Sequence, residues 1–539
     1  MTPDTTTTPA DVNEARDARC VLAIDHGTSG IKAALVGARG DVIDSDYERT
    51  PIQFLPGGGA EQDPELWWTA LVTAARRLVL RHAISPDKIG AVCVSSTFSS
   101  TVAVGADGRH LMPALTWMDS RGARHVKQVM GGFPSVLGYN IPRAIRWIRK
   151  TAGAPALSGK DDAAHALLVQ REYPEIYAQT RYFLPSKDYL NARLTGVLAS
   201  SPDAMHLFWV TDARDPERIV YDDQLIGMLG LDRDKLPPLV PATRVVGLLL
   251  PEVADALGLA RSTPVVSGSA DHQCALIGSG AVRDFEGHLY IGTSSWIECL
   301  VPFQKTDVIH SIASFPAAIP GKYQCLNEQD LAGGALSFLA DNILFRRHEL
   351  TGIPVPEDPY ALVNEIAAQV PAGSHKVLFT PWLNGERTPV DDIHVRGGFH
   401  NLSTTTTLED MVRAVLEGVA YNTRWSLQYV EKFVGRRLDP LRLIGGGAMS
   451  PLWCQIFADV LDREIHVVKD PRQANARGAA FLAAIGLGWI RFEEIPDLVP
   501  IASVFRPDPA NRALYDELFD AFVRLYGRMR PFYQRLNRV

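Results

Sequence analysis

Two glycine turns lie far apart in the chain and share one pattern. The first, Asp25-His26-Gly27-Thr28-Ser29-Gly30, follows an apolar segment, and apolar residues resume after it. The second, Gly292-Thr293-Ser294, stands between two apolar segments in the same way. Glycine beside hydroxyl residues in a tight turn lets backbone N–H groups close on an anion. Two such turns predict two lobes that hold one polyphosphate between them. Asp25, at the end of the first strand, is a candidate Mg²⁺ ligand, directly or through water.

Two further segments could contact a nucleotide. Lys32 follows the first turn and can supply a positive charge near phosphates. The run Gly445-Gly446-Gly447 stands between an apolar strand and a helix. Three glycines let a flat ring or a ribose approach the backbone, and a helix N-terminus favours anions. Taken alone, however, such a run is more often only a turn.

Asp271 is the candidate for acid–base chemistry. It follows a predicted strand, Thr263–Gly268, and small residues precede it. A carboxylate with little bulk around it can reach a substrate hydroxyl and take its proton while the oxygen attacks phosphorus. The alternative is that Asp271 only caps the N-terminus of a helix, where Asp is favoured. Position alone leaves both interpretations open.

The composition describes an ordinary globular protein. A chain of 539 residues is too long for one core and predicts two domains. The net charge of −7 argues against a general nucleic-acid surface. No apolar run approaches the roughly 20 residues of a membrane helix. Residues 1–20 lack the hydrophobic region of a secretory signal and are interpreted as a disordered tail or a remnant of cloning. Six scattered cysteines without C-x-x-C spacing predict reduced thiols and a cytoplasmic location.

Strand-turn-strand openings, followed by alternating helices and strands, recur in both halves of the chain. This order predicts duplicated α/β lobes, with the second starting near Asp284. Expected strands are 31–36, 89–94, 263–268 and 441–444, and expected helices are 64–82, 408–433, 451–461, 475–486 and 511–536.

Four longer segments resemble one known family. They are Leu184-Pro185-Ser186-Lys187-Asp188-Tyr189-Leu190, Trp117-Met118-Asp119-Ser120-Arg121, the run from Phe379 to Pro389 that contains Gly385-Glu386-Arg387, and Gly446-Gly447-Ala448-Met449-Ser450. Together with the glycine turns, they resemble the FGGY family of carbohydrate kinases in family order over about 21–500, nearest to xylulokinases.

The resemblance implies two ribonuclease H-like lobes of the actin-like ATPase type around a central cleft. Residues 21–283 would form the sugar-binding lobe, 284–500 the nucleotide-binding lobe and 501–539 a C-terminal helical extension. Asp271 falls at the position of the family's catalytic base, and Asp25 at that of its Mg²⁺-associated aspartate. The residues implied for the transferring phosphate and the nucleotide are Thr28, Lys32, Gly292, Thr293, Gly334, Gly446, Gly447 and Ala448.

The predicted sugar site departs from the xylulokinase pattern. Those enzymes carry Gly-Gln-Met-His-Gly where this chain has Ser96-Thr97-Phe98-Ser99-Ser100, and His272 replaces an Asn or Gln after the base. The hydrogen-bond donors available to a sugar therefore differ. The candidate substrate contacts are Thr97, Phe98, Ser99, Trp117, Asp119, Asp271 and His272. Trp117 is equally compatible with a position in the core. Glu386 and Arg387 are interpreted as an internal ion pair, and Lys187 and Asp188 as structural residues.

The resemblance implies transfer of the γ-phosphoryl of ATP, with Mg²⁺, to a hydroxyl of a small sugar. A ketopentose is the first expectation, and the alternatives are another ketose or a polyol such as a tetritol, a pentitol or a glycerol-like compound. A non-catalytic sugar-binding regulator on the same fold is the alternative from another class. An actin-like or chaperone-like ATPase is disfavoured because the sugar-kinase segments are present. The expected partners are sugar and ATP, with no nucleic acid and no membrane, and a homodimer remains possible.

Overall fold

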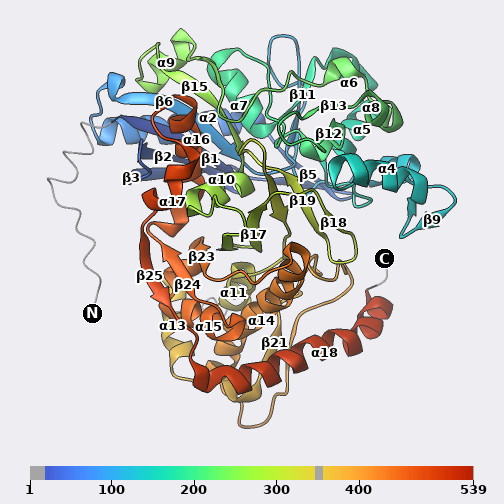
Figure 1. The fold of residues 1–539 in the computed structure, drawn as a ribbon, viewed down its shortest axis with the longest axis vertical. Helices are drawn as coiled ribbons and strands as arrows, with labels where there is room; N and C mark the ends of the chain where they lie inside the picture. The colour runs from blue at the N-terminus through green and yellow to red at the C-terminus, as the bar shows by residue number, and fades with distance from the viewer. Residues whose placement is uncertain (1–18, 346–355, 538–539) are drawn as a thin grey trace.

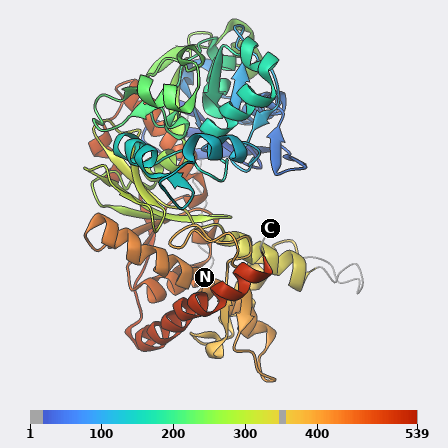
Figure 2. The same cartoon turned by 90° about the vertical axis from the view of Figure 1, so that its right-hand side faces the viewer.

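The computed structural model describes residues 19–345 and 356–537, arranged as two lobes (Figures 1 and 2). The predicted N-terminal tail lies outside the described residues, apart from Arg19 and Cys20. Cys20 is buried and begins the first strand, β1 (Cys20–Gly27), so it does not belong to a tail.

The N-terminal lobe is built on a six-stranded sheet in the order β14-β15-β6-β1-β2-β3. Its other strands are β2 (Gly30–Gly37), β3 (Val42–Arg49), β6 (Ile89–Ser96), β14 (Val245–Leu248) and β15 (Pro264–Ala270). Strands β1, β6 and β15 are mutually parallel neighbours, whereas β1 and β2 form an antiparallel hairpin around the first glycine turn. Helix α2 (Pro64–Arg81) starts at the Asp63 cap and buries Trp67 and Leu71 in the core of this lobe.

A second sheet in the N-terminal lobe has five short strands in the order β11-β7-β8-β5-β4. They are β4 (Gln53–Leu55), β5 (Gly59–Gln62), β7 (Thr101–Val104), β8 (Ala114–Leu115) and β11 (Tyr182–Pro185). Two small hairpins accompany it, β9 (Ser135–Val136) with β10 (Tyr139–Asn140), and β12 (Thr211–Asp212) with β13 (Val220–Tyr221). The helices of this region are α3 (Ala123–Met130), α4 (Ile141–Thr151), α5 (Asp162–Glu172), α6 (Pro174–Gln179), α7 (Ser186–Thr195), α8 (Asp223–Leu229) and α9 (Pro251–Leu257).

The C-terminal lobe is built on an eight-stranded sheet in the order β18-β19-β20-β17-β16-β23-β24-β25. Its strands are β16 (Gly287–Ile291), β17 (Ser295–Val301), β18 (Thr306–Asp307), β19 (Ile312–Pro316), β20 (Tyr323–Leu326), β23 (Leu441–Ile444), β24 (Ile465–Val468) and β25 (Ile501–Phe505). Its helices are α11 (Gly333–Leu339), α13 (Pro359–Ala368), α14 (Leu408–Val434), α15 (Pro451–Leu461), α17 (Ile495–Leu498) and α18 (Arg512–Leu536), and a hairpin joins β21 (Leu378–Thr380) to β22 (Gly398–His400).

Two helices connect the lobes. Helix α16 (Ala474–Gly486), drawn in red, lies among the blue strands of the N-terminal lobe although it comes from the C-terminal half of the chain (Figure 1). It packs against α10 (Asp271–Ser279), and one hydrophobic cluster joins both helices to strands of both sheets. The small residues of α16, which include Gly478, Ala479 and Ala480, allow this position.

The prediction of a helical extension over 501–539 is wrong at its start. Residues 501–505 form β25, which pairs antiparallel with β24 at the edge of the eight-stranded sheet. Helix α18 follows along the lower edge of the C-terminal lobe (Figure 1). It buries Tyr515, Phe519 and Phe522 in the core of that lobe, so it is an integral part of the lobe.

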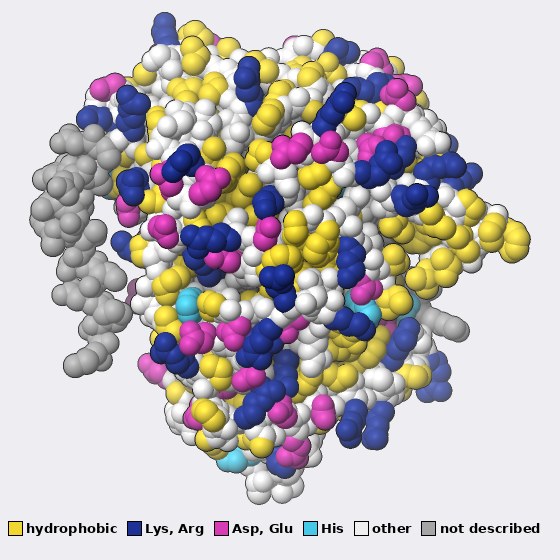
Figure 3. Space-filling view, in the orientation of Figure 1, with side chains coloured by type: hydrophobic (Ala, Val, Ile, Leu, Met, Phe, Trp, Pro, Cys, Tyr) yellow, Lys and Arg dark blue, Asp and Glu magenta, His cyan; other side chains and the backbone are white. Residues whose placement is uncertain are grey.

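Positive and negative side chains are interspersed on the face shown in Figure 3. Within residues 19–345 and 356–537, no helix is both long enough and apolar enough to span a membrane.

Candidate active site

The parallel strands of the N-terminal sheet bring the predicted base and the predicted Mg²⁺ ligand to one edge. Asp25 on β1 is in register with Ser95 on β6, and Ser95 is in register with Ser269 on β15. Asp271 comes directly after β15. Ligands of open α/β sheets bind beyond the carboxyl ends of such strands. Two carboxylates far apart in the sequence therefore flank the end of β6.

The second sheet repeats this arrangement for the glycine segments. Strands β16 and β23 are parallel, with Tyr290 in register with Ile444, so Gly292 and Gly445 emerge at the same edge. Gly445 has φ of +91°, and a Cβ there would lie 2.5 Å from the Ile291 carbonyl oxygen. In contrast, a Cβ on Gly446 would meet no atom within 4 Å. The backbone at Gly446 is therefore open to a ligand.

Helix α11 begins against the second glycine turn. The Gly333 N–H donates to the Gly292 carbonyl at 2.7 Å, and the Gly334 N–H donates to the Thr293 carbonyl at 3.0 Å. The Thr293 side chain stays exposed, whereas Ala448, beside the three glycines, is buried. Gly334 and Thr293 thus lie together, as the resemblance implies for a nucleotide site.

Asp271 is the first residue of α10, and its carboxyl group is partly exposed. The cap position belongs to Ala270, so the interpretation of Asp271 as a helix cap is wrong. One carboxylate oxygen accepts the His272 N–H at 2.9 Å. Burial raises the pKa of Asp271 to about 6, and the charge of Asp25 adds to the rise, whereas His272 opposes it. This carboxyl group is ionised at neutral pH and can accept a proton.

Asp25 and Lys32 are partners across the β1–β2 hairpin. The Lys32 ammonium lies 3.8 Å from the Asp25 carboxylate and donates to the Arg472 carbonyl at 3.0 Å. Asn475 of α16 donates to Asp25 at 3.4 Å. Burial raises the pKa of Asp25, and Lys32 opposes the rise. Both of these contacts to the carboxylate are long.

The Asp25 carboxylate fits a Mg²⁺ ion that is bound together with a nucleotide. The described residues contain no group of three or more His, Cys, Asp or Glu side chains that could hold a metal ion. Mg²⁺ usually takes one or two carboxylates and completes its shell with water and substrate phosphates. Asp25, beside the first glycine turn, matches that mode.

Among the predicted sugar contacts, Thr97 and Ser99 are buried and already hydrogen-bonded. The Thr97 hydroxyl pairs with that of Ser100 at 3.2 Å, and the Ser99 hydroxyl donates to the Lys160 carbonyl at 2.9 Å. Phe98 between them is partly exposed, and its ring centroid lies 6.4 Å from that of His272. Within this run, Phe98 is thus the side chain best placed to meet a substrate.

Trp117 and Asp119 lie in different environments. The Trp117 indole N–H donates to the Thr28 hydroxyl at 3.0 Å, and the Arg387 guanidinium lies 5.6 Å from the centre of its ring. Trp117 is therefore between the lobes and not in a core. Asp119 is fully buried and accepts hydrogen bonds from the Ala60 N–H and the Arg121 guanidinium. As placed here it positions Arg121, and its prediction as a sugar contact is not supported.

The predicted Glu386–Arg387 ion pair is wrong. Arg387 pairs with Glu328, and also with Asp330 at 2.7 Å. Glu386 is buried and accepts from the Asn422 amide, and burial followed by the charge of Asp330 raises its pKa to about 8. Glu386 is therefore largely protonated at neutral pH.

The Lys187–Asp188 prediction agrees with the structure. The Lys187 ammonium lies 2.6 Å from the Asp188 carboxylate, and both side chains are buried in the N-terminal lobe. The pair is structural.

Several residues near the site were missed by the sequence analysis. Glu328 lies close enough to Asp271 and His272 to affect the pKa of each. Lys160, whose side chain is exposed, lies near Arg387, Asp330 and Glu328. A signal existed for Glu328 and Asp330, since both lie within five residues before the Gly333-Gly334 pair. None existed for Lys160, whose position depends on the fold.

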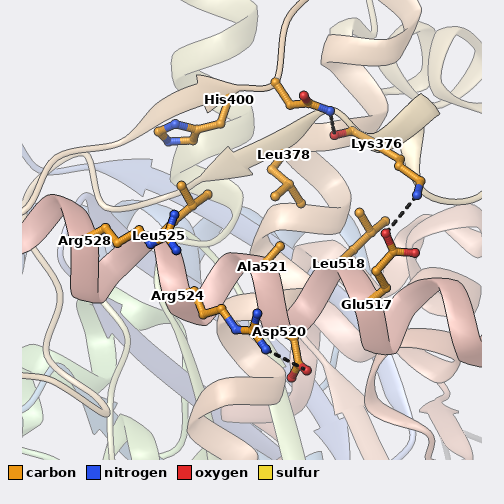
Figure 4. A pocket seen from close by; sticks show the side chains of 11 residues that line it. Lys376, Leu378, His400, Glu517, Leu518, Asp520, Ala521, Arg524, Leu525 and Arg528 are labelled. Atoms are coloured by element: carbon orange, nitrogen blue, oxygen red, sulfur yellow. Dashed lines mark hydrogen bonds and ion pairs between the residues drawn. The ribbon is translucent and has the colours of Figure 1, made fainter.

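A separate groove of about 560 Å³ lies on the C-terminal lobe between α18 and the β21–β22 hairpin (Figure 4). Lys376, His400, Arg524 and Arg528 line it above an apolar floor, and Lys376 is paired with Glu517 at 2.8 Å. No predicted site residue lines this groove.

Comparison with known proteins identifies the chain's relatives. The model of the FGGY family of carbohydrate kinases matches with its N-terminal domain over residues 20–278 and with its C-terminal domain over 289–487. The chain belongs to this family. It is 31% identical to the xylulose kinase of Escherichia coli K12, over 95% of this chain and 99% of the relative. It is 30% identical to the xylulose kinase of Staphylococcus epidermidis, over 94% and 96%.

The fold agrees with this assignment. The crystal structure of gluconate kinase from Lactobacillus acidophilus superimposes with a TM-score of 0.82 at 24% identity, over 96% of this chain and all of the other. The FGGY chain is thus a sugar kinase of the actin-like ATPase fold, and the predicted family, fold and enzyme class are confirmed.

Proposed function

We propose that this FGGY kinase transfers the γ-phosphoryl group of MgATP to a hydroxyl of a small uncharged sugar, with Asp271 as the general base. One observation carries the proposal. Asp271 is partly exposed at the edge where β1, β6 and β15 end, and no cation forms an ion pair with it among the described residues. A carboxylate placed in this way is available to accept a proton from a bound hydroxyl.

In the proposed step, Asp271 takes the proton of the acceptor hydroxyl. The acceptor oxygen then forms a bond to the γ-phosphorus, and the bond from that phosphorus to the bridging oxygen of ADP breaks. Mg²⁺, when bound, would neutralise charge on the phosphates, and Asp25 is the residue suited to hold it, directly or through water. Thr28 and Lys32 would face the transferred group, with Lys32 released from its contact with the Arg472 carbonyl.

The nucleotide would lie against the C-terminal lobe. Gly292 and Thr293 would contact its phosphates through the second turn, and Gly334 would back that turn. The open backbone at Gly446, flanked by Gly447 and Ala448, would receive the ribose or the base. The sequence order and the shared sheet edge support this assignment.

The charges near Asp271 favour an uncharged acceptor. Arg387 is paired with Glu328 and Asp330, His272 with Glu298, and Lys32 lies beside Asp25. Apart from the exposed Lys160, a carboxylate on the acceptor would thus find these cations already paired, and it would meet the charge of Asp271 itself. A ketopentose such as D-xylulose is the leading acceptor, followed by other ketoses and polyols, and then by aldonates.

The cellular setting is part of the same proposal. All six cysteines are buried, and Cys93, Cys274, Cys299, Cys325 and Cys454 are free thiols, which suits a reducing compartment such as the cytoplasm. The assembly that we propose is a homodimer, and size-exclusion chromatography with light scattering would test it.

The test is a coupled ADP-release assay with MgATP against D-xylulose, other ketopentoses, pentitols, tetritols, glycerol and gluconate. Selective turnover of one neutral acceptor supports the proposal, whereas selective turnover of gluconate overturns the preference for an uncharged acceptor. ATP binding without turnover of any acceptor would favour the sugar-binding regulator.

A further inference from the structure

The residue after the predicted base reaches into the other lobe. His272 Nδ1 on α10 lies 2.7 Å from a carboxylate oxygen of Glu298 on β17. The His272 side chain is 11% exposed and that of Glu298 is fully buried. A buried histidine–carboxylate pair at this distance is a charge-assisted hydrogen bond, which is stronger than a neutral one.

Glu298 is itself fixed by a second contact. Gln324 on β20 donates its amide to the other Glu298 carboxylate oxygen at 2.7 Å and to the His272 carbonyl at 3.2 Å. The same amide thus holds the carboxylate and the start of the helix that carries the base. Both oxygens of Glu298 are occupied, so the carboxylate has little freedom to turn.

The imidazole ring of His272 has two aromatic neighbours. His272 stacks on Trp296 with ring centroids 4.1 Å apart and an angle of 27° between the planes. The other is Phe98, from the run predicted to contact the sugar, with its ring centroid 6.4 Å away. Because Nδ1 is used by Glu298, Nε2 is the donor that remains, and it has no hydrogen-bond partner in the described part of the chain.

The groups around His272 keep it charged. Glu298, Asp271 and Glu328 are the carboxylates that act on it, while the neighbouring His288 on β16 is buried and stays neutral. Burial is the largest single influence and lowers the pKa of His272, but Glu298, Asp271 and Glu328 together outweigh it and raise the pKa to about 9. At pH 7 the ring therefore carries a proton on both nitrogens.

We propose that Glu298 is a positioning residue for the acceptor: it holds His272 so that the Nε2–H donates to an acceptor oxygen next to the hydroxyl that Asp271 deprotonates. This inference rests on the proposed kinase function. A fixed, charged donor favours an electron-rich oxygen, such as the carbonyl of an open-chain ketose, over a group that can only donate.

The test compares Glu298→Gln with the native enzyme, with D-xylulose as acceptor, from pH 6 to pH 8.5. For the native enzyme, KM for D-xylulose should stay flat while His272 remains charged. In the variant, the buried imidazole loses its proton in this range. KM for D-xylulose should then rise about tenfold to a hundredfold at pH 8 and recover in part at pH 6. KM for ATP should change less than about twofold.

A second variant separates positioning from folding. His272→Leu, which has no hydrogen-bond donor, should raise KM for D-xylulose at every pH, and the double variant should be no worse than His272→Leu alone, because Glu298 acts through His272. Glu417→Gln is the matched control, since Glu417 is buried on α14 and bonded to Arg413 and Tyr515. It should lower Tm and leave KM for D-xylulose unchanged.

The outcomes distinguish this inference from the proposed function. If native enzyme does not phosphorylate D-xylulose, the proposed acceptor fails. Calorimetric binding of D-xylulose by both proteins across the same pH range then decides the role of Glu298. Equal D-xylulose affinity for native and Glu298→Gln protein, with the same pH dependence, overturns the inference in either case.

Discussion

Gly278 of α10 and Gly478 of α16 lie at the point where these two helices cross. A Cβ on Gly478 would lie 1.9 Å from the Cys274 carbonyl oxygen, and one on Gly278 would lie 1.8 Å from the Ala474 carbonyl oxygen. The backbones can approach this closely only because neither residue has a side chain. Helix α10 begins with Asp271, and Asn475 of α16 donates to Asp25. The crossing therefore also helps to fix the predicted base relative to the predicted Mg²⁺ ligand.

The Gly478→Ala variant should be strongly destabilised. The new methyl would meet backbone rather than a movable side chain, so the free energy of unfolding should fall by about 3 kcal/mol. Gly527→Ala on α18 is the control, because its Cβ meets no atom within 4 Å. That substitution should leave stability unchanged or raise it by about 0.5–1 kcal/mol. Chemical denaturation measures both, and equal stability of the two variants would contradict the crossing.

The pH dependence of turnover should report Asp271. Its pKa of about 6 means that the base is ionised above pH 7 and progressively protonated below pH 6. We expect kcat/KM for the acceptor to be flat from pH 7 to 8 and to fall about tenfold per pH unit below 6. Asp271→Asn should lose a factor of about 10² to 10⁴ in kcat while retaining ATP binding. Normal turnover by this variant would rule out Asp271 as the base.

Elements defined by local signals were predicted well from the sequence. Helix α15 has its predicted bounds, Pro451–Leu461, because Ser450 caps it and proline opens it, and β23 likewise has its predicted bounds. Helix α14 extends one residue beyond the predicted range, to Val434, with Gly435 as its C-cap. In these cases the residues that set the ends of the element lie within it or directly beside it in the sequence.

The details of the site depend on partners that are distant in sequence. Arg387 pairs with Glu328, 59 residues before it, and not with the adjacent Glu386. Ser99 donates to a carbonyl 61 residues away, which uses the one proton that its hydroxyl could donate to a sugar. Residue types and motifs located the region of the site, but only the fold shows which polar groups are already satisfied.

The open backbone at Gly446 predicts a selective effect on the nucleotide. Gly446→Ala should fold normally, because its Cβ meets no protein atom within 4 Å. If ATP lies against this glycine, the methyl should raise KM for ATP about tenfold or more, which corresponds to the roughly 1–3 kcal/mol that an intruding methyl costs in a packed contact. KM for the acceptor should stay the same. Gly227→Ala on α8, which is equally open, is the control, and an unchanged KM for ATP in Gly446→Ala would place the nucleotide elsewhere.

Glu386 should make stability depend on pH. Its pKa rises from the ordinary 4.5 to about 8 in the folded protein, chiefly because it is buried. Between these values the folded state keeps a proton that the unfolded state has lost, so this group reduces stability as pH rises from about 5 to 8 and changes nothing further above 8. Glu386→Gln cannot ionise, so its Tm relative to native protein should increase across that range and then level off. Differential scanning fluorimetry from pH 5 to 9 measures this, with the exposed Glu493→Gln as control. Parallel curves for native protein and Glu386→Gln would mean that Glu386 is not held protonated by its surroundings.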